Sequence, residues 1–109
     1  MDGIYYVEFG TSGGAGGGLV VLSSGKAHGG DLSYLYAGTY EENPNNFSAK
    51  VEVKHWKGPR NNIFGNVEKI DLVLSGKEVS AGTIKGQGHP VGAPQRQMVF
   101  EMNKLRDLA

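Results

Sequence analysis

The strongest constraint in this sequence is an alternation of apolar and polar residues in the two halves of the segment Tyr34–His55. From residue 47 to residue 54, every second side chain is apolar, which is the pattern of a strand with one buried face. From Tyr34 to Tyr40, three tyrosines occupy even positions and therefore share one face of a second strand. An even-numbered loop around Pro44 and Asn45 makes the tyrosine face meet the apolar face.

This hairpin has one register that keeps its inner face apolar. The expected pairs are Glu42 with Phe47, Tyr40 with Ala49, Gly38 with Val51, Tyr36 with Val53, and Thr39 with Lys50. A shift by one residue would place the tyrosines against the lysines, because side chains alternate between faces at every residue. The pattern therefore predicts the pairing as well as the strands.

Six further segments have strand character and are separated by turn residues. With the hairpin, the expected strands are 4–9, 19–22, 26–29, 34–40, 47–55, 67–74, 79–87 and 97–103. No segment has a 3.6-residue periodicity long enough for a helix. Consecutive hairpins avoid exposed edges most simply by closing on themselves. The sequence therefore predicts one all-β domain over residues 1–109, an eight-stranded antiparallel up-and-down barrel.

The expected connections differ between the two ends of this barrel. Short turns at Ser24-Gly25, Pro44-Asn45 and Gly76-Lys77 would close one end, and longer glycine- or proline-containing connections would surround the other. Trp56 at this open rim is expected to cap the barrel. Eight strands leave room for side chains or for one small ligand. The residues expected to line that cavity are Tyr34, Tyr36, Tyr40, Val51, Val53 and Phe100.

The composition argues against several classes of function. Eleven basic and eleven acidic residues cancel, which disfavours a nucleic-acid or anionic-membrane surface. The chain has no cysteine and so no disulfide or thiolate metal site. No apolar run approaches the roughly 18 residues of a membrane span, and no signal-peptide pattern is visible. We therefore expect a cytoplasmic protein of bacterial type.

Glycine is abundant, with 18 residues that interrupt apolar or alternating runs, as turns and tight bends of a small closed sheet require. The glycines between residues 13 and 18 suggest a nucleotide-binding loop. Such a loop has to begin a helix, whereas this one is followed by the β-type run Leu19–Leu22. We interpret residues 10–18 as a flexible hairpin loop.

The histidines and serines do not predict a catalytic or metal site. His28, His55 and His89 lack the close spacing of a preformed metal pair. His28 with Asp31 could form a polar pair at the open end, but catalysis would also require a nucleophile or a substrate pocket. The serines lie in turns or on outer faces, without nucleophile-elbow spacing. We expect a protein that is not an enzyme and that uses no metal or cofactor.

The first two strands are apolar on both faces, whereas one face of an antiparallel sheet normally meets water. Something is therefore expected to cover the outer surface, and a second copy of the chain is the simplest candidate. The residues expected at this homodimer contact are Ile4, Tyr6, Leu19, Val20, Val21 and Leu22.

Several short motifs occur in an order that resembles one bacterial family. They are Asp2-Gly3-Ile4-Tyr5, Gly18-Leu19-Val20, Gly25, Gly29-Gly30-Asp31, Tyr36-x-Gly38-x-Tyr40 and Phe64-Gly65. The sequence resembles the GrlR family, small negative regulators of type III secretion gene expression. The similarity is clearest over residues 2–41 and weaker over residues 64–86.

The resemblance implies a lipocalin-like barrel that forms homodimers and regulates by protein contact, binding and blocking a transcriptional activator without reading DNA itself. In the characterised regulator, an acidic Glu-Asp-Glu-Asp motif follows the strand that corresponds to Tyr34–Tyr40. At the matching place this chain has Glu41-Glu42-Asn43-Pro44, so two of the four charges are kept. The expected partner contacts are Glu41, Glu42 and Asn43. The alternative hypothesis is a carrier that binds a small apolar ligand or lipid in the barrel.

Overall fold

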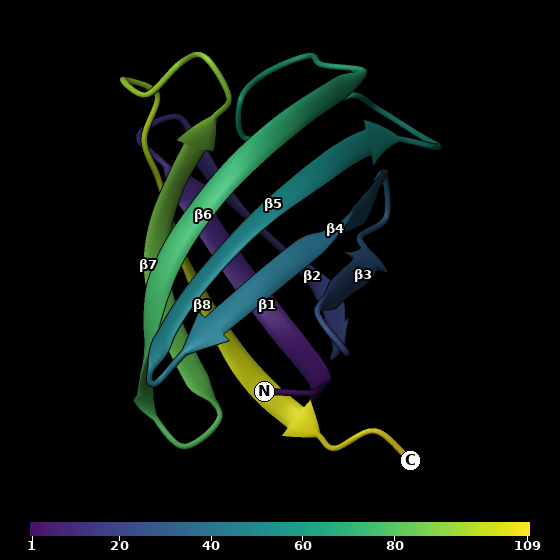
Figure 1. Ribbon diagram of the computed structural model, residues 1–109. Helices are drawn as coiled ribbons and strands as arrows, with labels where there is room; N and C mark the ends of the chain where they lie inside the picture. Colours follow the sequence, from purple (N-terminus) through teal and green to yellow (C-terminus); the bar gives the residue numbers. More distant parts are fainter.

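The computed structural model describes residues 1–109 and consists of eight strands without a helix (Figure 1). In chain order the strands are β1 (Gly3–Thr11), β2 (Gly14–Ser23), β3 (Lys26–Gly30), β4 (Tyr34–Asn43), β5 (Asn46–His55), β6 (Lys69–Ser80), β7 (Thr83–Pro90) and β8 (Met98–Arg106). Each strand pairs antiparallel with the next, and β8 pairs with β1, so the sheet is a closed barrel. The predicted fold class is confirmed. The structure has no helix of the length and apolarity needed to cross a membrane.

The register of the β4–β5 hairpin is the one that the alternation predicts. Tyr40 lies opposite Ala49, Tyr36 opposite Val53, and the other three expected pairs are also found. The loop consists of Pro44 and Asn45, and Asn45 adopts a left-handed backbone (φ 67°) that asparagine tolerates well.

The two ends of the barrel are closed in different ways. Two-residue turns at residues 24–25, 44–45 and 81–82 lie at the lower end in Figure 1, together with both chain termini. The upper end carries the connections of residues 12–13, 31–33, 56–68 and 91–97. The expected difference between the ends is present except at residues 12–13, where a two-residue turn replaces the expected long connection. We call the upper end the mouth.

The prediction of a flexible loop over residues 10–18 is wrong, because Gly14–Gly18 belong to β2 and the turn is only Ser12-Gly13. The glycines here make room for aromatic rings that lie on the strand. A Cβ atom would come within 2.9 Å of the Phe9 ring at Gly16, 2.7 Å of the Tyr6 hydroxyl at Gly17 and 2.8 Å of the Tyr36 hydroxyl at Gly18. Aromatic cover of this kind lets a glycine-rich segment remain in a sheet.

The predicted turn at Gly76-Lys77 is also wrong. Strand β6 continues to Ser80, with a register shift between Glu78 and Ser80, and the turn follows at Ala81-Gly82. A Cβ atom on Gly76 would lie 2.5 Å from the carbonyl oxygen of Lys85, so this glycine marks a close approach of two strands. Strand β7 accordingly begins and ends later than the sequence pattern indicated.

Side chains fill the lower end of the barrel. Tyr5, Leu22 and Ile84 are almost completely buried there. The Tyr40 and Phe47 rings are stacked with their centroids 5.9 Å apart. The lower end is therefore a packed core.

Candidate functional site

The lumen contains an apolar cavity of about 80 Å³. Nineteen residues line it, of which 17 are hydrophobic. Four of the six predicted cavity residues, Tyr36, Val51, Val53 and Phe100, are among them. Tyr34 and Tyr40 are buried in the barrel but do not line the cavity. Ligand pockets usually measure about 300–1,000 Å³, so the cavity in this conformation is smaller than a drug-sized molecule requires.

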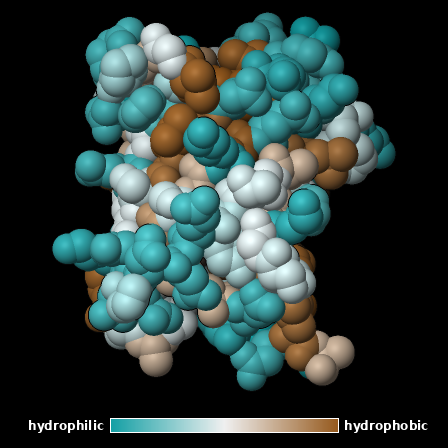
Figure 2. Space-filling model, viewed as in Figure 1, coloured by the Kyte–Doolittle hydropathy of each residue, from teal (hydrophilic) through white to brown (hydrophobic).

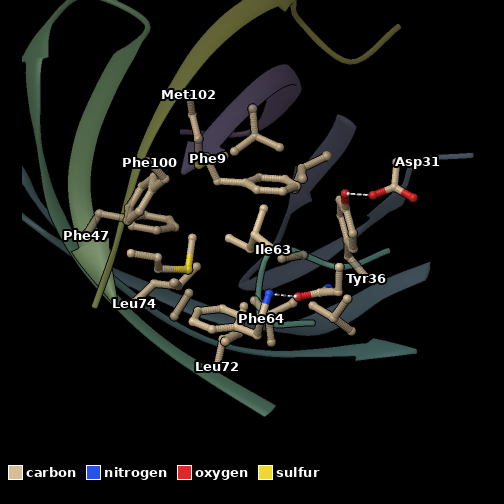
Figure 3. A pocket seen from close by; sticks show the side chains of 18 of the residues that line it. Phe9, Asp31, Tyr36, Phe47, Ile63, Phe64, Leu72, Leu74, Phe100 and Met102 are labelled. Atoms are coloured by element: carbon tan, nitrogen blue, oxygen red, sulfur yellow. Dashed lines mark hydrogen bonds between the residues drawn. The ribbon is translucent and has the colours of Figure 1, made fainter. Parts of the chain in front are cut away.

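The cavity is small because the mouth segment, residues 56–68, contributes two side chains to it. Ile63 and Phe64 line the lumen together with strand residues, and Phe64 is only 8% exposed. Figure 3 shows both side chains within the ring formed by Phe9, Tyr36, Phe47, Leu72, Leu74, Phe100 and Met102. We call the pair Ile63–Phe64 the plug.

A tight turn in the mouth segment directs the plug into the barrel. The Asn62 side-chain oxygen accepts a hydrogen bond from the backbone N–H of Phe64 (2.8 Å), and the Gly65 N–H donates to the Asn62 carbonyl (2.8 Å). Gly65 has a φ of 106°, which favours glycine over residues with a side chain. The sequence Asn62-Ile63-Phe64-Gly65 therefore presents two apolar side chains at the tip of a turn.

Other connections at the mouth hold the plug in place. The Arg96 guanidinium donates a hydrogen bond to the Phe64 carbonyl (2.8 Å) and lies 5.1 Å from the centroid of the Phe64 ring. Thr11 donates from its hydroxyl to the Ile63 carbonyl at 3.4 Å. Lower on the mouth segment, the Tyr34 hydroxyl donates to the Val67 carbonyl (2.7 Å). The connections of residues 56–68 and 91–97 thus form one structure over the lumen.

Asp31 organises the wall beside the plug. One carboxylate oxygen accepts hydrogen bonds from the backbone N–H groups of Ser33 and Tyr34, both at 2.8 Å, and the other accepts one from the Tyr36 hydroxyl. Burial, and then this hydrogen bond to Asp31, raises the pKa of Tyr36 well above its usual value. Tyr36 is therefore a neutral hydrogen-bond donor at physiological pH.

The plug is the part of the lumen that the sequence did not predict. The connection between the expected strands 47–55 and 67–74 was expected to surround the open end, and Trp56 was expected to cap the barrel. Trp56 is half exposed (50%), with its indole N–H 3.3 Å from the Asp31 carbonyl, so the capping prediction is wrong. The apolar pair between Asn62 and Gly65 was the available signal, because exposed loops rarely need two adjacent large apolar residues.

A second candidate site is an uncharged surface on the outside of β1 to β4. Tyr6 lies opposite Leu19, and His28 lies between Val21 and Ala37 on the neighbouring strands. Leu19 and Leu35 are 50% and 54% exposed. We call this surface the apolar outer face, and it comprises Ile4, Tyr6, Leu19, Val21, His28, Leu35 and Ala37.

The outside of β5 to β7 is different in character. Lys69 lies 3.4 Å from Glu52 and 3.7 Å from Asp71, and Lys85 pairs with Glu101 of β8 at 3.4 Å. The surface seen in Figure 2, over these strands, is mainly hydrophilic. These ion pairs lie on the outside of β5 to β8, away from the apolar outer face. Exposed apolar side chains also occur on β6 and β8, at Val79, Val99 and Leu105.

Two of the six predicted dimer residues do not lie on the apolar outer face. Val20 and Leu22 point into the barrel and are 9% and 0% exposed. That part of the prediction is wrong, because side chains of one strand alternate between faces and only Leu19 and Val21 of this run point outward. Ile4, Tyr6, Leu19 and Val21 are on the outside as predicted.

The predicted partner contacts lie at the end of β4. Glu41, Glu42 and Asn43 are all exposed. Strand alternation directs the two carboxylates to opposite sides, and Glu42 lies 3.4 Å from the N-terminal ammonium of Met1. The structure therefore does not gather these charges into one cluster, and Glu41 carries the unpaired carboxylate.

The histidines are not brought together. His28 is exposed on the outside of β3, whereas the Asp31 carboxylate is engaged with Tyr36 and two backbone groups. His55 contacts the Gly58 carbonyl (2.7 Å) and the ring of Tyr34 (5.6 Å between centroids), and His89 contacts the Pro90 carbonyl. No group of three or more His, Asp or Glu side chains is arranged to hold a metal ion.

Comparison of the sequence with protein-family models gives no match. Comparison with curated proteins also gives no match.

Proposed function

We propose that this protein is a non-enzymatic regulator that acts by protein contact, in the manner of the GrlR family, and that it functions as a homodimer. The observation that carries this proposal is the apolar outer face. This face is a contiguous uncharged area on neighbouring strands, whereas the outside of β5 to β8 carries paired charges. Contiguous apolar surface of this kind marks sites of protein interaction.

The motif resemblance supports the barrel architecture through identifiable contacts. Asp2 accepts a hydrogen bond from the Tyr40 hydroxyl at 2.7 Å, and Asp31 accepts one from Tyr36. Gly29 and Gly38 occur where a Cβ atom would come within about 2 Å of the next strand's backbone, at 1.9 and 2.0 Å respectively. These motif residues hold the strands together, so their occurrence in the same order as in the GrlR family supports the same fold. The residues that select the partner have to lie on the surface.

Native mass spectrometry tests the dimer. We expect a dimer for the unaltered chain and a monomer for Leu19→Lys, because a lysine at the centre of an uncharged contact has no partner for its charge. Val79→Lys is the matched control, since Val79 is similarly exposed (56%) but lies near the lower turn of β6. A monomeric unaltered protein contradicts the proposal.

Affinity purification from the source cells tests the regulatory contact. We expect a DNA-binding activator to co-purify with the unaltered protein and to be lost from Glu41→Lys/Glu42→Lys, because charge reversal repels a basic partner. The double variant Glu52→Lys/Asp71→Lys, with the same charge change on the outside of β5 and β6, should retain the activator. Equal recovery with both double variants would remove the β4–β5 turn from the proposal.

A further inference from the structure

We propose that the lumen is a binding site for a small, neutral, hydrocarbon-rich molecule, and that the plug moves outward when this molecule enters. The site is distinct from the apolar outer face and from the β4–β5 turn. It is defined by the cavity of about 80 Å³ and by the volume that Ile63 and Phe64 occupy next to it.

The lining determines the chemical class of the ligand. Seventeen of the 19 lining residues are hydrophobic, and the two polar ones, Asp31 and Asn62, already make hydrogen bonds within the protein. A ligand with strong polar groups would lose its hydration without gaining partners, which is unfavourable. A carboxylate ligand would also approach the carboxylate of Asp31. The site therefore favours neutral hydrocarbon-like molecules over fatty-acid anions.

The plug can move without breaking the barrel. Ile63 and Phe64 lie outside the eight strands, and the backbone pairing near them is a single isolated bridge between Asn62 and Gly65. Segments with few backbone pairs open at a lower free-energy cost than strands of a closed sheet. In Figure 3 the two side chains lie between the walls of the lumen, so their outward movement enlarges the cavity where it meets the mouth.

Arg96 is the residue that sets the cost of this movement. Its hydrogen bond to the Phe64 carbonyl and its contact with the Phe64 ring are both lost when the plug withdraws. Removal of the guanidinium should therefore make opening easier and ligand binding tighter, because apparent affinity rises with the population of the open form.

Methionine methyl groups provide a direct measurement in the intact protein. Met98 and Met102 line the cavity, whereas Met1 packs against the core at the lower end and is absent from the lining. With ¹³C-methyl methionine, we expect saturable shifts of the Met98 and Met102 signals on titration with toluene or 1-hexanol, and no comparable shift of Met1. Hexanoate at neutral pH should bind at least about ten-fold more weakly than 1-hexanol.

Variants of the plug and its contact make the test specific. Phe64→Ala should bind 1-hexanol more tightly than the unaltered protein, because the removed ring leaves volume in the lumen. Arg96→Gln should tighten toluene binding by about ten-fold, the effect of one lost charge-assisted hydrogen bond. Arg60→Gln is the control, since Arg60 lies in the mouth segment with the plug but pairs with Glu68 at 2.9 Å instead of contacting Phe64.

Three results would overturn the proposal. The first is an absence of saturable Met98 and Met102 shifts in both the unaltered protein and Phe64→Ala. The second is hexanoate binding as tightly as 1-hexanol, which would refute the neutral ligand class. The third is an equal response of Arg96→Gln and Arg60→Gln, which would refute the control of the plug by Arg96.

Discussion

The Tyr36 hydroxyl donates a hydrogen bond to the Asp31 carboxylate over a distance of 2.5 Å. This bond joins the inner face of β4 to the connection that precedes it. The same carboxylate caps the backbone of residues 33 and 34, so one side chain fixes the start of β4 and the position of an aromatic ring in the lumen. Gly18 leaves room for the Tyr36 hydroxyl, because a Cβ atom at this position would lie 2.8 Å from the hydroxyl oxygen.

Removal of the Asp31 carboxylate should be more destabilising than removal of the Tyr36 hydroxyl. Asp31→Ala loses three hydrogen bonds, whereas Tyr36→Phe loses one. We expect losses of about 3 kcal/mol and about 1–2 kcal/mol respectively in the free energy of unfolding, from the usual contribution of hydrogen bonds to charged groups. Urea unfolding monitored by Trp56 fluorescence measures both, and the reverse order would contradict this role of Asp31.

Stability should decrease at alkaline pH because three tyrosines, Tyr5, Tyr36 and Tyr40, have raised pKa values. Burial and the hydrogen bond to Asp2 raise the pKa of Tyr40 to about 12, and burial with the hydrogen bond to Asp31 raises that of Tyr36 further. A raised pKa in the folded state contributes stability that is complete below the unfolded value of about 10 and is lost as pH rises above it. We expect the urea midpoint to decrease above about pH 10 and to change less in Tyr36→Phe/Tyr40→Phe.

The hydrogen bond between Tyr40 and Asp2 should also make stability depend on pH in the acidic range. The hydrogen bond from Tyr40, and then that from the Ser24 N–H, lowers the pKa of Asp2 below its ordinary value. A lowered pKa contributes stability that is present above the ordinary value of about 3.9 and is lost as pH decreases through the folded-state pKa. Asp2→Asn should therefore flatten the pH dependence of thermal unfolding in this acidic range. An unchanged slope would show that the contact does not contribute.

The effect of a glycine-to-alanine substitution on stability should depend on whether the new Cβ atom would meet the backbone of another strand. A Cβ atom on Gly38 would lie 2.0 Å from the Lys50 carbonyl oxygen, whereas one on Gly14 meets nothing within 4 Å. We expect Gly38→Ala to destabilise the barrel by at least about 3 kcal/mol because the strands must separate. Gly14→Ala should change stability by less than about 1 kcal/mol. Thermal unfolding of the two variants provides the comparison, and similar effects would contradict the close strand approach at Gly38.

Shortening the plug should lower stability moderately. Phe64→Ala removes a buried ring and its contact with Arg96, so we expect a loss of about 2–3 kcal/mol, less than is usual for a central core phenylalanine because the mouth segment can relax. The near-ultraviolet circular dichroism of the other aromatic residues should be retained. Loss of that signal would show that the plug is needed for the barrel itself.

The predictions from sequence succeeded where the signal was local. Alternation from Tyr34 to Val53 specified two strands and their register, because a one-residue shift would expose an entire apolar face. They failed at Gly14–Gly18 and at Gly76, where glycine was interpreted as a mark of turns. In both places the glycine is needed because a distant residue approaches closely, and that information is absent from the local pattern.

The pattern of residues along the chain predicts the eight-stranded barrel, the β4–β5 register, the inner and outer faces of most strands and most of the difference between the two ends. Each of these follows from the period of the side chains and from turn residues, which are properties of short segments. Only the folded protein shows that Ile63 and Phe64 occupy the lumen, that Arg96 contacts Phe64 and that Asp31 bonds to Tyr36. The contacts of Ile63, Phe64 and Arg96 join different connections at the mouth, which barrel closure brings together. The bond between Asp31 and Tyr36 joins a connection to the inner face of the strand that follows it.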